Sequence, residues 1–366
     1  MAEIIAVAMS GGVDSSVAAA LLKQQGHDVV GITLQLWPKA AADLDRHHGC
    51  CSLDAVEDAR RVASHLDLPY YVLDVQDEFQ ARVVEPFLVD YEQGRTPNPC
   101  ISCNNEVKFD LLLRKARSIG AAGLATGHYA RVDRADDRHR LLRAIDPGKD
   151  QSYVLYGLGQ DELQAARFPL GTWRKDDVRA AARRLGLITA DKPDSVEICF
   201  VTGGDYRELL ARRRTDAGGA IQYVDGTPLG SHAGIWNYTV GQRSGLGALP
   251  RGLSGPLFVV DIDASNRVVT MGPREALRRE LIEVGEVSFV AGSAPAEVFD
   301  ADVRVRYGAA PVAAHVTLGA GATLQVHPHA PLGSASPGQA AVLYAGDEVL
   351  GGGRILRAAI PEAAPA

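Results

Sequence analysis

One segment near the N-terminus, IIAVAMSGGVDSS, restricts the fold of this chain more than any other. Its apolar run over residues 4–9 is typical of a buried strand, and the Ser-Gly-Gly of residues 10–12 follows as a tight turn. Asp14, Ser15 and Ser16 then open a predicted helix. Backbone N–H groups of a glycine-rich turn, with the positive end of a helix dipole, can hold a phosphate or pyrophosphate. The segment therefore predicts an α/β domain that carries an anion-binding loop.

The same segment differs from two common phosphate-binding motifs. It lacks the Lys of the Walker A pattern, and its glycines do not follow the GxGxxG spacing of dinucleotide-binding loops. Ordinary γ-phosphoryl transfer and dinucleotide binding are therefore both disfavoured. The simpler interpretation, a helix N-cap after an ordinary turn, does not account for the whole SGGVDSS run in a strand–turn–helix context.

The first third of the chain alternates strands with helices. Apolar runs predict strands at residues 3–9, 29–34, 70–75 and 122–126, and helical periodicity predicts helices at residues 16–25, 55–66 and 108–119. This alternation predicts a parallel sheet with helices on both faces. Two predicted loops, residues 37–52 and 93–104, are long for a compact domain, and loops of that kind are usually functional.

After residue 200 the pattern changes to short alternating strands joined by Gly, Asn and Asp turns. Such spacing predicts antiparallel sheets or small barrels. We therefore expect three domains: an α/β domain over residues 1–202, a small central β-rich domain over residues 203–280, and a C-terminal β-barrel-like domain over residues 281–366.

Composition excludes several other classes of protein. With 46% hydrophobic and 23% charged residues, the chain is typical of a globular protein. No stretch reaches the ~18 apolar residues that a membrane-spanning helix needs. The N-terminus has the acidic Glu3, no basic region and early glycines, so it does not resemble a signal peptide. The expected location is the cytoplasm, with no membrane partner.

Charge gives a weaker indication. The chain has 38 Lys and Arg against 45 Asp and Glu, and the net charge of −7 argues against a nucleic-acid partner. Its middle third is the most basic part. Arginines gather there in two groups, Arg131, Arg134, Arg138, Arg140 and Arg143, and then Arg212, Arg213 and Arg214. This pattern fits solvated helix and hairpin faces better than a nucleic-acid footprint.

The chain has five cysteines, Cys50, Cys51, Cys100, Cys103 and Cys199. In a reducing compartment, an odd number of cysteines indicates catalysis, redox chemistry or metal binding rather than a disulfide framework. The pair at residues 50–51 follows His47 and His48, which suggests zinc. Adjacent cysteines chelate poorly, however, and we assign no metal there.

Several motifs together carry a family resemblance. SGGVDSS resembles the PP-loop of enzymes that split ATP into AMP and pyrophosphate and adenylate a carbonyl-type oxygen. Further motifs follow in order: TPNPCISCNNEVKFD (96–110), TGHYAR (126–131), KDQSYVL (149–155), DSVEICF (194–200), GQRSGLG (241–247) and PGQAAVLY (337–344). Together they resemble the tRNA-specific 2-thiouridylase family over nearly the whole chain. The resemblance implies a Rossmann-like PP-loop domain followed by β-rich central and C-terminal β-barrel modules, the last of them binding tRNA.

The implied activity is ATP-dependent sulfur transfer to C2 of the wobble uridine, giving 2-thiouridine in the anticodon. Replacing the uridine oxygen needs a leaving group, a sulfur nucleophile and a route for releasing the sulfur. Adenylation by ATP supplies the first, and a cysteine persulfide supplies the second. By resemblance Cys199 carries the persulfide and Cys103 is the partner thiol that closes a disulfide as the sulfur leaves. The alternative is a [4Fe–4S] cluster held by Cys100, Cys103 and Cys199, with one iron open to sulfide.

The resemblance also assigns binding residues. For ATP and Mg²⁺ it indicates Ala8, Met9, Ser10, Gly11, Gly12, Val13, Asp14, Ser15, Leu34 and Gly127, with Asp14 at the Mg²⁺ end. For the anticodon arm of tRNA it indicates Asn98, Pro99, Cys100, His128, Lys149, Asp150, Gln151, Arg306, Tyr307 and Gln339. The implied substrates are the tRNAs for Lys, Glu and Gln. The implied partner is a sulfur donor, either a cysteine desulfurase or a sulfur relay protein.

The chain departs from the family pattern at three places. Cys100 stands where some members have Asp, which leaves the general base open. Val196 and Glu197 replace the Thr and Gly found before the second cysteine, and Leu34 replaces a common Met. Two other functions fit the motifs less well. An amidating PP-loop ligase would need an ammonia source, and no such domain is visible; a tRNA-binding protein without catalysis leaves SGGVDSS and the cysteines at 103 and 199 unexplained.

Overall fold

The computed structural model describes residues 3–36, 53–194, 198–201, 206–213, 218–245 and 255–359. The predicted loop over residues 37–52, with Cys50 and Cys51, lies outside this part of the chain, as do Val196 and Glu197. Within it, no helix is long and apolar enough to cross a membrane.

The N-terminal domain is built on a five-stranded sheet. Its order is β3 (Tyr70–Asp74), β2 (Asp28–Gln35), β1 (Ile4–Ala8), β4 (Gly123–Ala125) and β7 (Ala166–Arg167). Every neighbouring pair is parallel, which confirms the sheet type expected from the alternation of strands and helices.

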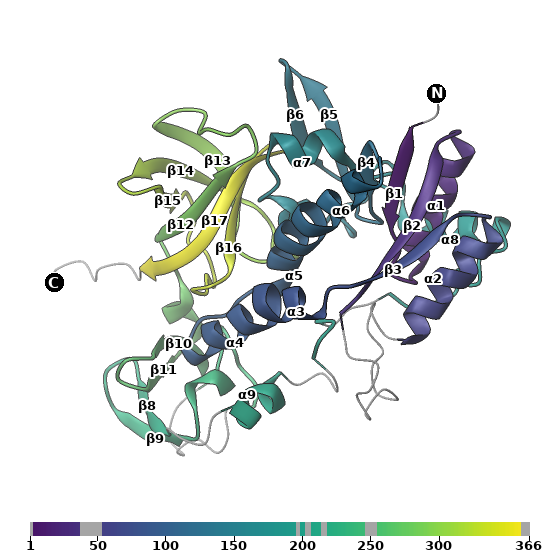
Figure 1. Ribbon diagram of the computed structural model, residues 1–366. Coiled ribbons are helices and arrows are strands. Elements are labelled where there is room, and N and C mark those ends of the chain that lie inside the picture. Colours follow the sequence, from purple (N-terminus) through teal and green to yellow (C-terminus); the bar gives the residue numbers. More distant parts are fainter. Residues whose placement is uncertain are drawn as a thin grey trace.

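Helices cover both faces of this sheet (Figure 1). One face carries α1 (Val13–Gln24), α2 (Leu53–His65) and α8 (Lys175–Arg184), and the other carries α6 (Leu113–Ser118) and α7 (Gln160–Ala165). Side chains of a strand point alternately to the two faces, and β1 divides accordingly. Ile5 and Val7 pack with the first group of helices, and Ala6 packs with the second.

The sequence patterns miss one long helical segment and place a second one incompletely. The first consists of α3 (Gln76–Phe79), η2 (Gln80–Val84) and α4 (Glu85–Glu92), and was not predicted. The second consists of α5 (Pro99–Ser102), η3 (Cys103–Leu112) and α6, so the predicted loop at 93–104 is too long and the predicted helix at 108–119 begins too late. The reason is local: Asn98 caps the helix by accepting from the Cys100 N–H, and Pro99 suits the first helical position.

The central region forms a four-stranded sheet in the order β10 (Phe258–Asp263), β11 (Val268–Gly272), β8 (Gly219–Tyr223) and β9 (Pro228–His232). The β11–β8 pair is parallel and the other two pairs are antiparallel. Helix α9 (Arg207–Arg213) and the short 3-10 helices η6 (Ile235–Asn237) and η7 (Arg274–Leu277) complete this region, and a further 3-10 helix, η4 (Ser152–Leu155), belongs to the first domain. Aromatic side chains of α4, including Phe87, pack into the same cluster as Val259 and Met271 of this sheet.

The C-terminal region is a closed six-stranded barrel. Its strands are β12 (Leu281–Phe289), β15 (Thr323–Pro328), β14 (Val312–Gly319), β13 (Val298–Arg304), β16 (Ala340–Ala345) and β17 (Glu348–Ala359), and pairing of β12 with β17 closes the ring. A hairpin of the first domain, β5 (Ala130–Ala135) and β6 (Arg138–Arg143), joins this sheet because β6 pairs with β17. The sequence patterns did not predict that hairpin.

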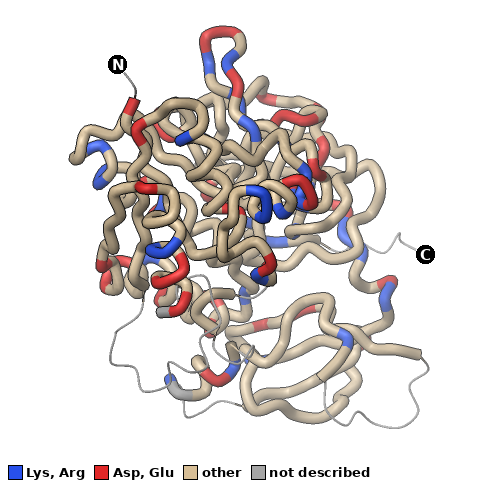
Figure 2. The backbone as a smooth tube through the Cα atoms, turned by 90° about the vertical axis from the view of Figure 1, so that its right-hand side faces the viewer, with Lys and Arg blue, Asp and Glu red and all other residues tan. Residues whose placement is uncertain are grey.

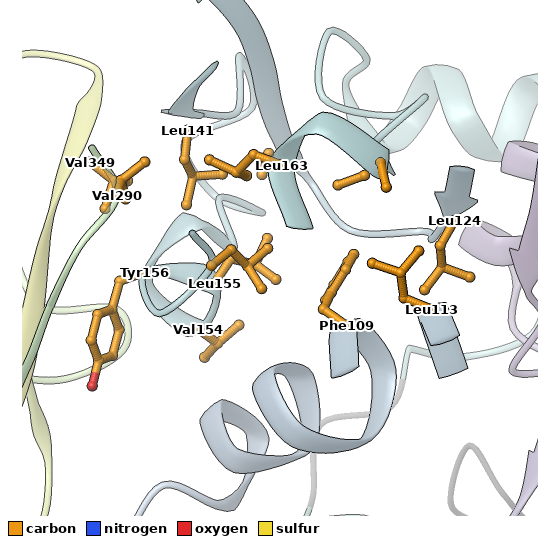
Figure 3. Close-up of a cluster of buried hydrophobic side chains, with 14 of the residues drawn as sticks. Phe109, Leu113, Leu124, Leu141, Val154, Leu155, Tyr156, Leu163, Val290 and Val349 are labelled. Carbon is orange, nitrogen blue, oxygen red and sulfur yellow. The ribbon is translucent and has the colours of Figure 1, made fainter. Parts of the chain in front are cut away.

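A hydrophobic cluster runs between the α/β domain and the barrel (Figure 3). Phe109 and Leu124 enter it from the helix and sheet of the first domain, and Val290 and Val349 enter it from the barrel. All four side chains are at most 1% exposed. The two domains therefore share a core, which fixes the barrel against the first domain.

Candidate active site

The Gly-rich turn between β1 and α1 has the geometry of an anion cradle. Gly11 has a φ of +68°, and a Cβ there would lie 2.0 Å from the Ala55 carbonyl oxygen, so no other residue fits. Gly12 is the N-cap of α1 and has an extended backbone. The first N–H groups of the helix consequently face the turn without a side-chain cap. These features fit a bound pyrophosphate or nucleotide phosphate.

Hydroxyl groups fix the turn from inside. The Ser10 N–H donates to Ser15 Oγ (3.1 Å), and Ser15 Oγ donates to the Gly12 carbonyl (3.2 Å). Ser16 Oγ donates to the same carbonyl at 2.8 Å. The cradle is therefore preorganised by residues within six positions of one another.

Gly127 closes the cradle from the end of β4. A Cβ at this position would lie 2.7 Å from the Ser15 backbone nitrogen and 3.0 Å from the Asp14 Cβ. This close approach requires glycine and places residue 127 against the start of α1. Leu34 lies near the carboxyl end of β2, partly buried between two hydrophobic clusters. The structure thus brings Gly127 to the loop formed by residues 8–15, as ATP binding would require.

His128 lies beside Gly127 and is partly buried. Its Nδ1 and the Thr126 hydroxyl are 2.7 Å apart, and its ring contacts Phe109 and Phe168. Burial, helped by the charge of Lys108, lowers the pKa of His128 well below its ordinary value. The ring is therefore neutral in the folded protein at physiological pH.

A charged network that the sequence patterns missed adjoins the cradle. The Lys175 ammonium, 8% exposed, donates to both oxygens of Asp14, at 2.7 and 2.8 Å, and also pairs with Asp194 at 2.8 Å. The Tyr129 hydroxyl donates to Asp14 at 2.8 Å. Asp14, expected to face Mg²⁺, is therefore held by a lysine and a tyrosine. No local signal marks Lys175, because it is 161 positions from Asp14 on an amphipathic helix.

Asp194 connects this network to the segment that leads to Cys199. Its carboxylate accepts from Lys149 (2.7 Å) and Arg179 (2.8 Å) as well as from Lys175. Partial burial alone would raise the pKa of Asp194, but the hydrogen bonds from the two lysines outweigh it and lower the pKa to about 2. A further cation, Lys192, donates to the Gly11 carbonyl at 3.0 Å. Lys175 thus bonds to the cradle at Asp14 and Lys192 at Gly11, and Lys192 is also paired with Asp58 at 2.6 Å.

Both proposed catalytic cysteines pack against one hydrophobic cluster. Cys103 and Cys199, 96 positions apart in sequence, are each partly buried against it. Phe200 anchors the second of them through edge contacts with Phe79 and Phe87, at centroid distances of 6.0 and 4.9 Å. Cys100, in contrast, is exposed on the first turn of the α5 helix.

The alternative of an iron–sulfur cluster gains no support from the positions of the cysteines. Across the described ranges, which include Cys100, Cys103 and Cys199, no three His, Cys, Asp or Glu side chains form a group that could hold a metal ion. A [4Fe–4S] cluster on those three cysteines would need such a group. The zinc alternative at residues 47–51 falls outside the described residues.

Residues expected to face RNA come together from two domains. Tyr307, 49% exposed in the loop after β13, has its ring 6.2 Å from that of Tyr153. Partial burial raises the pKa of Tyr307, and the nearby groups that influence it include Lys149 and Cys100. Arg306 is exposed on the same loop. The fold therefore gathers the barrel loop, the turn at Lys149 and the start of α5 in one place.

Several residues expected to contact RNA also bond within the protein. Asp150 is 7% exposed, accepts from the Ala144 and Ser152 N–H groups, and pairs with Arg304 of the barrel at 3.0 Å. These bonds hold the turn at residues 149–152. Gln151 Oε1 accepts from the Tyr129 N–H at 2.9 Å. Gln339 Nε2 donates to the Thr96 and Pro97 carbonyls of the first domain. Asn98 caps α5, and Pro99 is buried.

The basic group at residues 131–143 is largely neutralised. Arg131 pairs with Asp347, Arg138 and Arg140 with Glu348, and Arg134 with Asp137. Figure 2 shows acidic and basic residues alternating along this hairpin, at the top of the view. Of the second group, Arg213 pairs with Glu85 and Glu92, and Arg214 is outside the described residues. Among the described side chains, these carboxylate partners fit solvated helix and hairpin faces better than a nucleic-acid footprint.

Comparison with known proteins gives matches over nearly the whole chain. Residues 3–203 match the tRNA methyl transferase HUP domain, residues 207–273 the tRNA methyl transferase PRC-barrel domain, and residues 279–355 the aminomethyltransferase beta-barrel domain.

Two curated relatives carry the name tRNA-specific 2-thiouridylase MnmA. The protein of Geobacter metallireducens is 49% identical over 358 residues, which cover 96% of each chain. The protein of a Roseiflexus species is 47% identical over 379 residues, which cover 98% of this chain and 100% of the relative. A solved NMN synthetase from Francisella tularensis covers 57% of this chain and 73% of its own at 18% identity and a TM-score of 0.34, too weak a likeness to add to the argument.

Proposed function

Because the chain belongs to the tRNA-specific 2-thiouridylase family, it is a tRNA-uridine 2-sulfurtransferase, and we propose how its residues divide that work. The observation that carries the assignment is identity of 46–49% to relatives of that name along nearly the full length of both chains. Two of the matched domains are described as those of a tRNA methyl transferase, and the third as that of an aminomethyltransferase. An ATP-type PP-loop and two cysteines in matching motifs favour sulfur transfer, because methyl transfer requires neither.

We assign ATP to the loop of residues 8–15, with Leu34 and Gly127 beside it. When bound, ATP supplies an adenylate leaving group on the C2 oxygen of the target uridine. The amides of the Ser10–Gly12 turn would hold the phosphates, and Lys175 and Lys192 would offset their charge. Asp14 would hold Mg²⁺ through a carboxylate oxygen, a hard ligand suited to that ion.

We assign the sulfur chemistry to Cys199 and Cys103. The terminal sulfur of a persulfide on the first attacks uridine C2, and AMP leaves with the former carbonyl oxygen. The Cys103 thiolate then attacks the inner sulfur of Cys199, which breaks the S–S bond, leaves sulfur on the base and forms a disulfide between the cysteines. An external thiol must reduce that disulfide before the next turnover. Packing of both residues against one hydrophobic cluster supports this pairing.

We assign the anticodon arm to the surface that Lys149, Arg306 and Tyr307 share with the start of α5. Arginine and lysine suit phosphate, and an exposed tyrosine suits stacking on an unpaired base. The wobble uridine must leave its stack to reach a cysteine, so base flipping is part of the proposal. The proposal also includes the tRNAs for Lys, Glu and Gln as substrates, a cysteine desulfurase or relay protein as sulfur donor, and a cytoplasmic location.

The test is nucleoside mass spectrometry of tRNA from a strain that lacks the gene. We expect 2-thiouridine to disappear and to return with the wild-type gene. Complementation with Cys103→Ser or Cys199→Ser should fail, whereas Cys100→Ser should restore the nucleoside if the persulfide route is correct. Unchanged 2-thiouridine in the deletion strain would contradict the function, and failure of all three serine variants, with iron bound to wild type purified without air, would favour the cluster.

A further inference from the structure

A short segment of the barrel, residues 336–339, lies where all three domains meet. The Ser336 hydroxyl donates to the Val240 carbonyl of the central domain at 3.2 Å. Within the barrel, the Gly338 N–H donates to the Ile355 carbonyl at 2.9 Å, and the Ile355 N–H donates to the Gln339 carbonyl at 2.8 Å. The segment is therefore fixed to β17 on one side and to the central domain on another.

Its third contact is with the chain that leads into the α5 helix. The Thr96 N–H donates to the Pro337 carbonyl at 2.8 Å. In the opposite direction, Gln339 Nε2 donates to the Thr96 carbonyl at 2.8 Å and to the Pro97 carbonyl at 3.5 Å. Both backbone groups of Thr96 are thus bonded to the barrel.

Gly338 makes this contact possible. Its φ is +92°, a region that favours glycine, and a Cβ there would lie 2.9 Å from the Thr96 nitrogen and 3.0 Å from the Arg95 Cβ. The barrel backbone therefore approaches the first domain as closely as two backbones can at this point.

Arg95, the residue before Thr96, makes a second contact with the barrel. Asp90, 6% exposed, accepts from Arg95 Nε at 2.9 Å and Nη2 at 2.7 Å, and it also pairs with Arg354 of β17. Residues 95 and 96 are thus both tied to the barrel, one through a shared carboxylate and the other through main-chain bonds.

Displacement at Thr96 would be transmitted to the cysteines. Pro97 and Pro99 have fixed φ angles, and Asn98 caps the helix by bonding to the Cys100 N–H at 3.2 Å. Cys103 lies at the end of the first helical turn. The chain from residue 96 to residue 103 therefore has few soft torsions that could absorb a shift.

We propose that Gln339 is a positioning residue that sets the place of the Cys103 helix from the barrel. The barrel then takes part in the chemical step as well as in holding RNA. This inference rests on the proposed function of Cys103. The amide nitrogen of Gln339 is already bonded to two carbonyls of the loop, so the proposal gives this side chain a role besides the expected RNA contact.

The experiment compares Gln339→Met, which keeps the volume and removes the donor, with Gln325→Met on the exposed face of β15 as matched control. Three quantities are measured: the Kd for tRNA, the single-turnover thiolation rate at saturating tRNA with preloaded persulfide, and the alkylation rate of Cys103 by peptide mass spectrometry. We expect Gln339→Met to leave Kd within about twofold, to lower the thiolation rate about 10- to 100-fold, as small misplacements of reacting groups do, and to change the Cys103 alkylation rate. Gln325→Met should change none of them.

Rescue distinguishes positioning from a general structural fault. Gln339→Lys restores a donor within reach of the Thr96 carbonyl and should recover most of the thiolation rate. A weaker Kd with an unchanged rate in Gln339→Met would overturn the proposal and return Gln339 to RNA binding. An unchanged alkylation rate at Cys103 would also overturn it. If wild type makes no 2-thiouridine, the proposed function fails, and the alkylation measurement still decides whether the barrel positions Cys103.

Discussion

The nucleotide loop and the cysteine site are constructed in opposite ways. The loop consists of consecutive residues, and the hydrogen bonds that shape it join positions three to five apart. The cysteine site draws on residues around 96–103, 149, 199, 307 and 339, and the bond from Gln339 to Thr96 spans 243 positions. The turn keeps its own shape through bonds between near neighbours, whereas the cysteine site depends on how the domains are joined.

The largest expected effect is the loss of thiolation in Cys199→Ser, which changes the cysteine site and not the nucleotide loop. Cys199→Ser removes the sulfur nucleophile and should abolish thiolation, while the nucleotide loop is left intact. Pyrophosphate release in the presence of tRNA should therefore continue at a rate near that of wild type for one turnover. Loss of both activities in this variant would show that the two regions are not separable.

Asp14→Ala changes the nucleotide loop and leaves the cysteine site intact. Removing this carboxylate disturbs the Mg²⁺ end of the cradle and leaves Lys175 without one of its partners. Pyrophosphate release should fall by at least about 100-fold, and tRNA affinity should stay within about twofold. The exposed Asp28→Ala on β2 is the control and should release pyrophosphate normally. Pyrophosphate release from Asp14→Ala at the wild-type rate would contradict the role assigned to this loop.

The junction between the domains can be weakened at the buried pair of Arg304 and Asp150. These side chains are 10% and 6% exposed, so Arg304→Met leaves a buried carboxylate without its cation and should lower the free energy of unfolding by about 3 kcal/mol. Urea titration measures this. Arg134→Met, which breaks an exposed pair, should cost less than about 0.5 kcal/mol. Equal losses would show that the first pair is not shielded from water.

Salt dependence tests which cations face RNA. Affinity for tRNA should fall as salt rises, and each phosphate contact contributes about −0.7 to the slope for single strands. Arg306→Gln should reduce the slope by about one such contact, because this side chain is exposed beside Tyr307. Arg138→Gln should leave it unchanged, because that arginine is paired with Glu348 at 2.6 Å. A flat salt response in wild type would remove the electrostatic part of the RNA site.

The smallest effect concerns pH. Burial lowers the pKa of His128 below the value of 6.5 expected in the unfolded chain, so the unfolded state binds a proton more readily than the folded state. Stability is therefore full above about pH 6.5 and falls with decreasing pH by at most about 1.4 kcal/mol per unit. His128→Gln should flatten this part of the stability curve, and the exposed His329→Gln should not. An unchanged curve in His128→Gln would assign the pH response to another group.

Features that depend on near neighbours follow from the order of residues alone. Alternating strands and helices fixed the parallel sheet, because each pattern reflects which side chains one strand or helix buries. The glycines of SGGVDSS fixed the cradle, because a positive φ and a close backbone approach are local requirements. Matching motifs around Cys103 and Cys199 marked both cysteines, although nothing local showed that they pack against the same cluster.

The partners of distant groups depend on how the helices, strands and domains pack together. Lys175 meets Asp14 because α8 packs beside α1, and the amphipathic pattern of α8 says which face is buried but not against which helix. The same holds for the hairpin of residues 130–143, where Arg138 pairs with Glu348 of β17. It also holds for Gln339, whose partners are backbone carbonyls, and these carry no sequence signal. Ion pairs and main-chain bonds between domains depend on three-dimensional distance, and a single sequence records only the order of residues along the chain.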